Sequence, residues 1–331
     1  MPHPNSLISS DPELKSRSHR NLTTFMSDYG IMVAFLVLCI VLSVVSPYFL
    51  SFSNLLNVLR QVSINGVLAI GMTFVILTRG IDLSVGSMMA FAAIVAASFA
   101  GASADSPLIL SILLGLGAGL GLGSINGVMV ARFAIPPFVM TLGMLSMARG
   151  LTYIYSDGMP ISNLSSSFLW LGQGAVVGIP VPVLLFAAVF ALAWFALRYT
   201  TFGRYVYAVG GNPTASHLSG INVRRITFAV YAISGILCGL AGLMIAARTS
   251  AALPQAGVAY ELDAIAAVVI GGTSLAGGKG RIAGTLFGVL IIGVINNGLD
   301  LLGVSSFYQQ LVKGAIIVVA VMLDRSRVNN A

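Results

Sequence analysis

The stretch TTFGRYVYAVGGNPTASHLSGINVRR, residues 200–225, is the longest internal segment that lacks an apolar run of membrane-spanning length. It carries three arginines and no acidic residue. Asn212 followed by Pro213 is the pattern of a helix N-cap and first helical position, and Gly220 is typical of the residue just past a helix. We therefore predict a short helix over residues 213–219, held in a basic loop between two apolar segments.

The composition places most of the chain in a membrane. Of the 331 residues, 57% are hydrophobic and only 8% are charged, against about 25% charged in an average soluble protein. The formal net charge of +7 does not indicate nucleic-acid binding, because the arginines are mostly single residues at the ends of apolar runs, where they mark membrane orientation. Cys39 and Cys238 each fall inside an apolar run, so we interpret them as core residues and expect no disulfide framework.

Apolar runs of about 20 residues, the length that spans a bilayer, recur along the chain. The predicted fold class is an all-α polytopic membrane protein of about ten transmembrane helices, with both termini cytoplasmic. The predicted helices cover residues 29–49, 54–77, 81–100, 107–131, 136–155, 179–197, 226–247, 261–272, 281–302 and 305–323. Between the fifth and sixth of these, an extramembrane loop is expected to carry Phe168 and Trp170 as interfacial aromatic anchors.

Two of these helices have particular features. Asn54 is predicted to cap the second helix. The eighth, residues 261–272, is short enough to span only half of the membrane, supported by neighbouring helices. The predicted domain organisation is a cytoplasmic N-terminal tail, a transmembrane domain that contains the cytoplasmic loop, and a cytoplasmic C-terminal tail, at residues 1–28, 29–323 (loop 200–225) and 324–331.

The basic residues support this order and orientation. With the N-terminus inside, 13 of the 17 lysines and arginines fall on the cytoplasmic side, as the positive-inside rule requires. The exceptions are Arg60, Arg149, Arg248 and Lys313. This orientation places residues 200–225 in the cytoplasm.

Glycines and small residues mark two further patterns. Gly115, Gly119, Gly123 and Gly127 recur at a spacing of four, which predicts a helix face that another helix can approach closely. Residues 75–87 and 269–280 both run from an apolar stretch into a Gly/Ser-rich break, a faint internal repeat. An inverted repeat would put the two breaks on opposite sides of the membrane, whereas the predicted topology puts both in the cytoplasm.

The sequence indicates neither catalysis nor a cofactor. Residues 277–280, GGKG, resemble part of a phosphate-binding loop but lack the Ser or Thr after lysine and the early glycine. His3, His19 and His217 are isolated in polar segments, so neither a metal site nor a catalytic triad is indicated. We expect no enzymatic activity, no catalytic residue, no bound metal and no cofactor.

Amide side chains are the candidate residues of a translocation path: Asn65, Asn126, Asn296 and Asn297 lie within or near predicted helices. Amides offer donors and acceptors to a neutral polyhydroxyl solute. They also serve ordinary interhelical hydrogen bonds, and both interpretations stay open. Asp82 starts the third predicted helix, where a helix cap and a functional contact are the two interpretations.

Four stretches occur in a recognisable order: GIDLSVGS at 80–87, AVGGNPTASHLSGINV at 208–223, GGTSLAGGKGRIAGT at 271–285 and NNGLDLLGVSSFYQQLVKGAIIVVAV at 296–321. Together they resemble the permease subunit of a bacterial ribose-type monosaccharide ABC importer, over nearly the whole chain after residue 21. The resemblance implies a multi-pass protein of the bacterial inner membrane that translocates a sugar and is driven by a separate ATPase.

The resemblance also implies partners. These are a second permease chain in a homo- or heterodimer, a cytoplasmic ABC ATPase and a periplasmic sugar-binding protein, in membrane lipid and without nucleic acid. The family's ATPase-contacting loop corresponds here to Asn212, Pro213, Ala215, His217 and Gly220. A self-powered secondary carrier or channel for a small neutral polar solute is the alternative, which uptake in the absence of any ATPase would favour.

Overall fold

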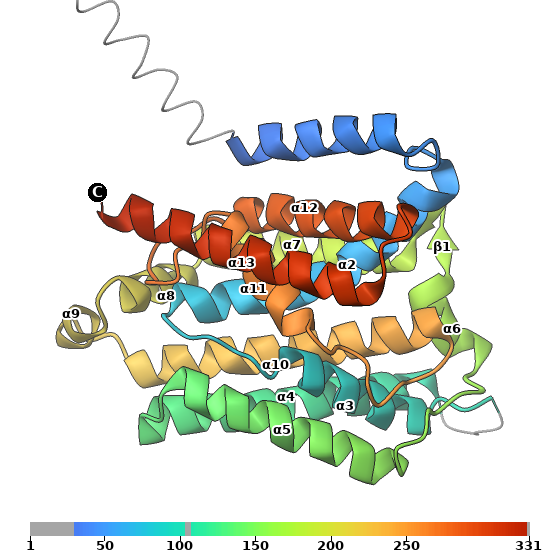
Figure 1. Ribbon diagram of the computed structural model, residues 1–331. Coiled ribbons are helices and arrows are strands. Elements are labelled where there is room, and N and C mark those ends of the chain that lie inside the picture. Colours follow the sequence, from blue (N-terminus) through green and yellow to red (C-terminus); the bar gives the residue numbers. More distant parts are fainter. Residues whose placement is uncertain (1–29, 103–106, 330–331) are drawn as a thin grey trace, which may run out of the picture.

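The computed structural model describes residues 30–102 and 107–329. They form a bundle whose helices run mostly along one direction, with α8 and α9 at one end and α6 and β1 at the other (Figure 1). A helix at Gly30–Val45 comes first. The further elements are α2 (Phe52–Leu77), α3 (Val85–Ser98), α4 (Leu108–Phe133), α5 (Pro137–Ser156), α6 (Ser166–Gln173), β1 (Ala175–Val176), β2 (Ile179–Pro180), α7 (Val181–Tyr199), α8 (Thr201–Gly211), α9 (Pro213–Leu218), α10 (Val223–Thr249), α11 (Tyr260–Ile270), α12 (Ile282–Leu301) and α13 (Ser306–Asn329).

Helix α2 is the central helix of the bundle. It is buried without interruption from Val62 to Leu77 and packs against α7, α10, α11 and α12. Burial on every side explains why this run is apolar all round. The prediction that Asn54 caps the helix is wrong, because the helix begins at Phe52 and the side chain of Ser51 caps it, accepting from the Asn54 amide at 3.4 Å.

Within the described residues, five helices are long and apolar enough to cross a membrane: α2, α4, α7, α10 and α12. Helices α3 and α11 have 14 and 11 residues. At 1.5 Å per residue they are about 21 and 17 Å long, short of the roughly 30 Å of a hydrocarbon core. Each follows a non-helical segment, residues 78–84 and 250–259 respectively. The predicted helix at 81–100 therefore starts four residues too early, and Asp82 precedes α3.

The two short helices begin beside each other inside the bundle. A Cβ atom on Gly86 would overlap the carbonyl oxygen of Gly257, and a Cβ atom on Gly257 would lie 2.5 Å from the carbonyl oxygen of Gly86. Only glycine permits two backbones to come this close. The first turn of α3 is thus in close backbone contact with the non-helical segment that leads into α11.

From this contact the short helices run in opposite directions. After α3, the Ala100 carbonyl accepts from Ser165 N, next to α6 at one end of the bundle. After α11, the Gly278 amide donates to the Leu77 carbonyl, next to α8 at the other end. Residues 78–84 and 250–259 therefore enter the bundle from opposite ends. The geometric counterpart of 78–84 is 250–259, not the break at 269–280 that the sequence suggested.

The glycine stripe of α4 packs as predicted. Cβ atoms on Gly119 and Gly123 would overlap or crowd the backbone of Gly235 on α10, and one on Gly127 would lie 2.9 Å from the Phe228 carbonyl oxygen. On the other face of α4, no described atom outside the helix comes within 4 Å of a Cβ on Gly121. The stripe therefore lets α4 and α10 pack backbone against backbone.

The predicted loop at 156–178 has more structure than expected. It contains α6 and β1, and β1 pairs as an antiparallel hairpin with β2, which occupies the first two residues of the predicted helix at 179–197. Phe168 is fully buried, so its prediction as an interfacial anchor is wrong, while Trp170 is exposed. The hydroxyl of Ser165 caps α6 by accepting from the Phe168 backbone amide, and the Phe168 side chain packs in the core.

The first and last described helices leave the chain ends on one side of the bundle. The helix Gly30–Val45 packs on α12 with ring centroids of Phe35 and Phe287 6.5 Å apart, and Ile31 reaches Gly272 near the α8 end. Helix α13 ends at the same side (Figure 1) and includes the first six residues of the predicted C-terminal tail. The predicted N-terminal tail, residues 1–28, lies outside the described residues.

Candidate functional site

Helix α9 projects from the end of the bundle (Figure 1). The Oδ1 atom of Asn212 accepts from the Ala215 amide at 3.0 Å, Pro213 holds the first position, and Gly220 has a φ of +84°. A left-handed residue ends a helix most cheaply when it is glycine. The predicted cap and stop are confirmed, and the helix is one residue shorter than predicted.

Most of this short helix faces solvent. Asn212, Ala215, His217 and Gly220 are exposed and Pro213 is half-buried. Leu218, which the sequence reasoning missed, is 82% exposed. A single exposed apolar side chain is common on protein surfaces, so Leu218 adds to the exposed face of α9 without marking an interface by itself. The signal in the sequence was a single leucine between His217 and Ser219 in an otherwise polar loop.

Helix α8 fixes α9 to the bundle, although its residues were predicted to be loop. Arg79 Nε donates to the Gly210 carbonyl at 2.6 Å, and the same guanidinium donates to the Gly211 carbonyl at 2.5 Å. A Cβ on Gly210 would overlap the carbonyl oxygen of Leu77 and crowd the amide of Gly278. A displacement of α9 would therefore be passed to the end of α2 and to the glycine-rich loop after α11.

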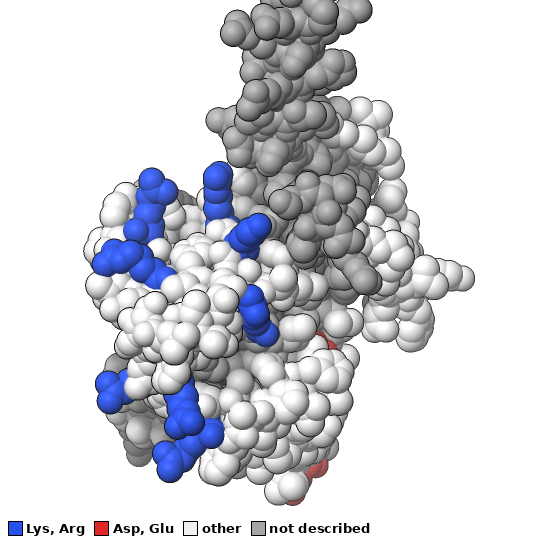
Figure 2. All heavy atoms as spheres, turned by 90° about the vertical axis from the view of Figure 1, so that its left-hand side faces the viewer, with Lys and Arg blue, Asp and Glu red and all other residues white. Residues whose placement is uncertain are grey.

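The α8–α9 end is basic. Figure 2, which faces this end, shows lysine and arginine side chains distributed across it. Arg132 and Arg198 end α4 and α7 there, and Arg224 and Arg225 begin α10. The arginines cluster because each lies at a helix terminus and these termini meet at this end of the bundle.

Asp82 is fully buried in a polar cluster shared by three helices. Its Oδ1 accepts from Ser84 N at 3.0 Å and from Ser84 Oγ at 2.5 Å, and its Oδ2 accepts from Ser234 Oγ of α10 at 3.3 Å. Asn126 of α4 donates to Ser84 Oγ at 2.9 Å, while its Oδ1 has no partner among the described residues. The cluster fixes the start of α3 to α4 and α10.

A second buried cluster lies at α11. Lys313 Nζ of α13 forms an ion pair with Asp263 Oδ2 at 2.9 Å, and Asn296 of α12 donates to the same oxygen at 3.4 Å. The Oδ1 atom of Asn296 has no partner in the part of the chain that the structure describes. The ion pair was missed. Its signal was an acid in the first turn of one apolar helix and a lysine inside another apolar run.

The structure does not bring the four candidate asparagines together. Asn126 lies in the Asp82 cluster and Asn296 in the Asp263 cluster. Asn297 is paired reciprocally with Asn54, at 2.7 and 2.9 Å, which makes it an interhelical contact between α12 and α2. Asn65 is buried in α2 with an Oδ1 that finds no described partner.

A polar cavity of about 300 Å³ lies near the opposite end of the bundle. It is lined by Asn57, Arg60, Gly172, Gln173 and Arg248. Among the described residues, the buried Nε of Arg60 has no hydrogen-bond partner. A buried guanidinium donor without an acceptor is costly, so the cavity suits a carboxylate or another strong acceptor.

Comparison with known proteins adds to this geometry. Residues 54–321 match the family described as branched-chain amino acid transport system / permease component. The chain is 49% identical over 300 residues to the ribose import permease protein RbsC of Escherichia coli (strain K12), covering 89% of this chain and 93% of the relative. It is 49% identical over 304 residues to RbsC of Bacillus subtilis (strain 168), covering 91% and 94%. The D-allose transport system permease protein AlsC of Escherichia coli (strain K12) is 39% identical over 314 residues, covering 95% and 96%. No solved structure matches the chain.

Proposed function

The chain belongs to the family of branched-chain amino acid transport system permease components, and we propose that it is the permease subunit of a bacterial ABC importer for a monosaccharide of the ribose type. The relatives, 39–49% identical over about nine tenths of the chain, are named for ribose and allose, which favours a sugar over an amino acid. The protein is a multi-pass protein of the bacterial inner membrane.

Ten membrane passes account for all of the long elements. The five long apolar helices supply five, and the helix Gly30–Val45, α5 and α13 supply three. The remaining two are composite passes, residues 78–98 and 250–270, each a non-helical segment followed by a short helix. The basic end faces the cytoplasm under the positive-inside rule, so both termini are cytoplasmic.

The observation that supports the coupling proposal is that α9 is exposed at the basic end and is fixed to the bundle through α8. Asn212, Pro213, Ala215, His217 and Gly220 form the contact for a cytoplasmic ABC ATPase, with Leu218 as its apolar centre. Movement of the ATPase shifts the equilibrium between two states of the permease, to which it binds with different affinity. The hydrogen bonds of Arg79 to Gly210 and Gly211 transmit that movement to α2.

The sugar path passes the junction of α3 and α11. Half-helices that begin at mid-membrane beside polar residues are typical substrate sites in transporters. Asn126 and Asn296 each hold an unpaired amide oxygen there, and Asn65 holds another in α2, all able to accept hydrogen bonds from sugar hydroxyls. These groups are buried in the state described here, and the opening of the bundle exposes them.

The cavity with Arg60 and Arg248 belongs to the outer face. Two guanidinium groups in one polar cavity, one with a buried unpaired Nε, suit a carboxylate of the periplasmic sugar-binding protein. A second permease chain, identical or related, completes the transporter.

The coupling proposal is tested in proteoliposomes that contain the permease, its ATPase and its sugar-binding protein. Ala215→Glu and Leu218→Asp change exposed side chains, so we expect normal membrane levels, with sugar uptake reduced at least about tenfold while ATP hydrolysis persists, equivalent to some 1.4 kcal/mol of coupling. Phe133→Ser, at an exposed side chain on the same end but outside α8 and α9, is the matched control. Unchanged uptake in both variants rules out the role of α9, and uptake without ATPase favours a self-powered carrier.

A further inference from the structure

The hairpin of β1 and β2 carries an apolar tip at the end of the bundle opposite α9 (Figure 1). Val176 pairs with Ile179, and Val177 and Gly178 form the two-residue turn between them. Val176 and Ile179 are 42% and 46% exposed, and Val177, at 96%, is the most exposed large apolar side chain of the described residues. A Cβ atom on Gly178 would meet no described atom within 4 Å, so the turn is open on this side.

The backbone of the turn disfavours the valine that occupies it. Val177 has a φ of +51° and Gly178 a φ of +80°, which is the pattern of a type I′ hairpin turn. The first position of that turn favours asparagine, aspartate or glycine, because a β-branched side chain is strained in the left-handed region. Exposure of one apolar side chain is common by itself. Here neither burial nor turn geometry accounts for the valine, and a strained position that the fold does not require points to a function.

The base of the hairpin is held between α6 and α7. The Gly174 amide donates to the Trp170 carbonyl at 2.9 Å, and the Val181 amide donates to the Gly174 carbonyl at 2.9 Å. Helix α7 begins at Val181, directly after β2. The tip is therefore presented in a fixed orientation, which lowers the entropic cost of a contact with another molecule.

The hairpin adjoins the polar cavity that holds Arg60 and Arg248. Gln173, two residues before β1, lines that cavity and donates to Ser250 Oγ at 2.8 Å and to the Ala247 carbonyl at 3.0 Å. The two guanidinium groups are close enough for their like charges to interact, and no acidic side chain of the described residues lines the cavity. A cationic recess beside an apolar tip complements a protein surface on which carboxylates flank an apolar depression.

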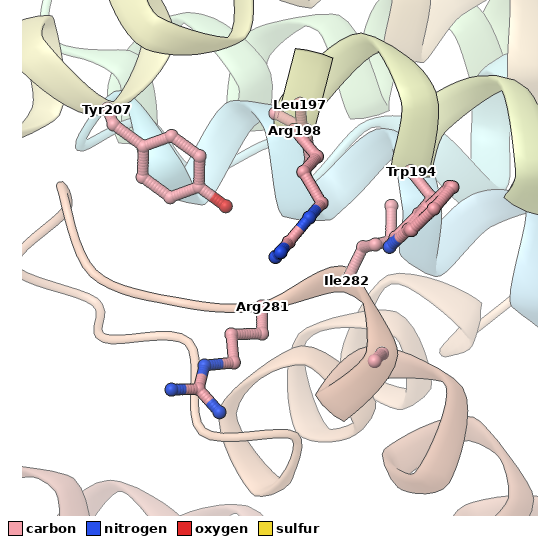
Figure 3. A pocket seen from close by; sticks show the side chains of 7 residues that line it. Trp194, Leu197, Arg198, Tyr207, Arg281 and Ile282 are labelled. Atoms are coloured by element: carbon pink, nitrogen blue, oxygen red, sulfur yellow. The ribbon is translucent and has the colours of Figure 1, made fainter.

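The cavity at the basic end of the bundle does not form a comparable recess. It measures about 290 Å³, and Arg198 and Arg281 both line it. In Figure 3 the Arg281 guanidinium points away from Arg198, on the other side of the segment that leads into α12. The two charges do not converge there, so the features that point to a partner lie at the outer end.

We propose that the hairpin tip, residues 176–179, docks into an apolar depression on the periplasmic sugar-binding protein, next to the carboxylate that enters the cavity. This inference rests on the proposed function, in which that protein delivers the sugar to the outer face. Lipid is a poorer occupant, because the central peptide groups of a two-residue turn have no ladder partner and are costly in hydrocarbon. Interfacial anchors in membranes are mostly tryptophan and tyrosine, whereas an apolar centre with arginines beside it is typical of protein interfaces.

The test measures uptake by the permease and its ATPase in proteoliposomes while the concentration of the sugar-binding protein is varied. Val177→Asn supplies the residue that a type I′ turn favours, so the unfolding midpoint should stay the same or rise. The concentration of binding protein that gives half-maximal uptake should increase about tenfold, equivalent to some 1.4 kcal/mol, near the lower end of the range for burial of one valine. Val177→Ile keeps both the strain and the apolar surface, so as the matched control it should leave that concentration nearly unchanged.

A labelling experiment separates the binding protein from lipid as the occupant of the tip. In a variant with Cys39 and Cys238 replaced by alanine, Val177→Cys should react with a membrane-impermeant maleimide, and saturating binding protein should slow the reaction. Resistance of this thiol to maleimide when no binding protein is present would place the tip in lipid and overturn the proposal.

Three further outcomes overturn the proposal. One is an unchanged half-maximal concentration in Val177→Asn, and another is labelling that the binding protein does not slow. The third is a lower unfolding midpoint in Val177→Asn, which would make the valine a structural residue of the hairpin. Uptake by the unaltered protein that does not depend on any binding protein would instead contradict the proposed function itself.

Discussion

At the scale of single residues, the interior is organised by a few carboxylates that gather donors from several helices. Asp82 receives three hydrogen bonds from Ser84 and Ser234, and Asp263 receives two, from Lys313 and Asn296. Neither acid lies within a regular run of polar residues. In a bilayer such groups are retained only where the bundle satisfies them, and both sit at the beginnings of the short helices.

Substitution of Asp82 separates its role as a hydrogen-bond acceptor from its role as an acid. Asp82→Ala removes the partner of the buried Ser84 amide, so we expect a loss of about 1–3 kcal/mol in the free energy of unfolding. Asp82→Asn keeps an oxygen at Oδ1 and should lose less than half as much. The measurement is the unfolding midpoint of the purified protein in detergent. Equal losses in the two variants would show that the charge, rather than the acceptor, holds α3.

At the scale of helices, two contacts set the architecture: the glycine contact of α4 with α10, and the meeting of α3 with α11. The first brings two long helices together along most of their length. The second joins two helices that are each too short to cross the membrane, so that each depends on the other and on the surrounding long helices for burial.

The two faces of α4 provide a matched pair of substitutions. A side chain at Gly119 would overlap the Gly235 carbonyl, so Gly119→Val should destabilise the bundle by about 3 kcal/mol or more and lower the yield in the membrane. Gly121→Val adds the same side chain where no described atom lies within 4 Å, and it should change the unfolding midpoint little. Comparable losses at both positions would mean that helix propensity, not packing, dominates.

The ion pair between α11 and α13 is tested by a double-mutant cycle. Lys313→Met leaves the carboxylate of Asp263 buried without its cation, which should cost about 3–5 kcal/mol. Asp263→Asn combined with Lys313→Met removes both charges and should recover most of that loss. Unfolding midpoints of the single and double variants give the coupling energy. A double variant as unstable as the sum of the single variants would leave the pair without an energetic role.

At the scale of the whole molecule, the charge distribution and the chain ends point to one orientation. The described chain ends and the basic termini of α4, α7 and α10 share the end that carries α8 and α9. The hairpin and α6 lie at the other end (Figure 1). The proposed contact of α9 with an ATPase requires that this end faces the cytoplasm, and the position of the basic residues favours that orientation.

Cysteine accessibility measures that orientation directly. In a variant with Cys39 and Cys238 replaced by alanine, Leu218→Cys at the tip of α9 and Val177→Cys in the hairpin place thiols at sites that are 82% and 96% exposed. A membrane-impermeant maleimide should label position 177 in intact spheroplasts and position 218 only in inside-out vesicles. Labelling of position 218 from outside would reverse the topology and remove the coupling role of α9.

The sequence by itself determined the class of protein, the positions of most long helices and the α9 cap, because these depend on local properties. The length of an apolar run predicts a membrane-spanning helix, the basic residues at its ends predict its orientation, and Asn212 followed by Pro213 predicts a helix cap. None of these predictions depends on distant parts of the chain. Helix boundaries for α4, α5 and α7 fell within two residues of the prediction for the same reason.

Only the tertiary structure decided which residues meet. Gly86 and Gly257 lie 171 residues apart, and neither neighbourhood indicates that the other will touch it. The same holds for Asn297 with Asn54, for Asp263 with Lys313, and for Arg198 with Arg281, which line one cavity. Such pairings arise from packing between distant segments, and periodicity along one segment carries no information about its partner.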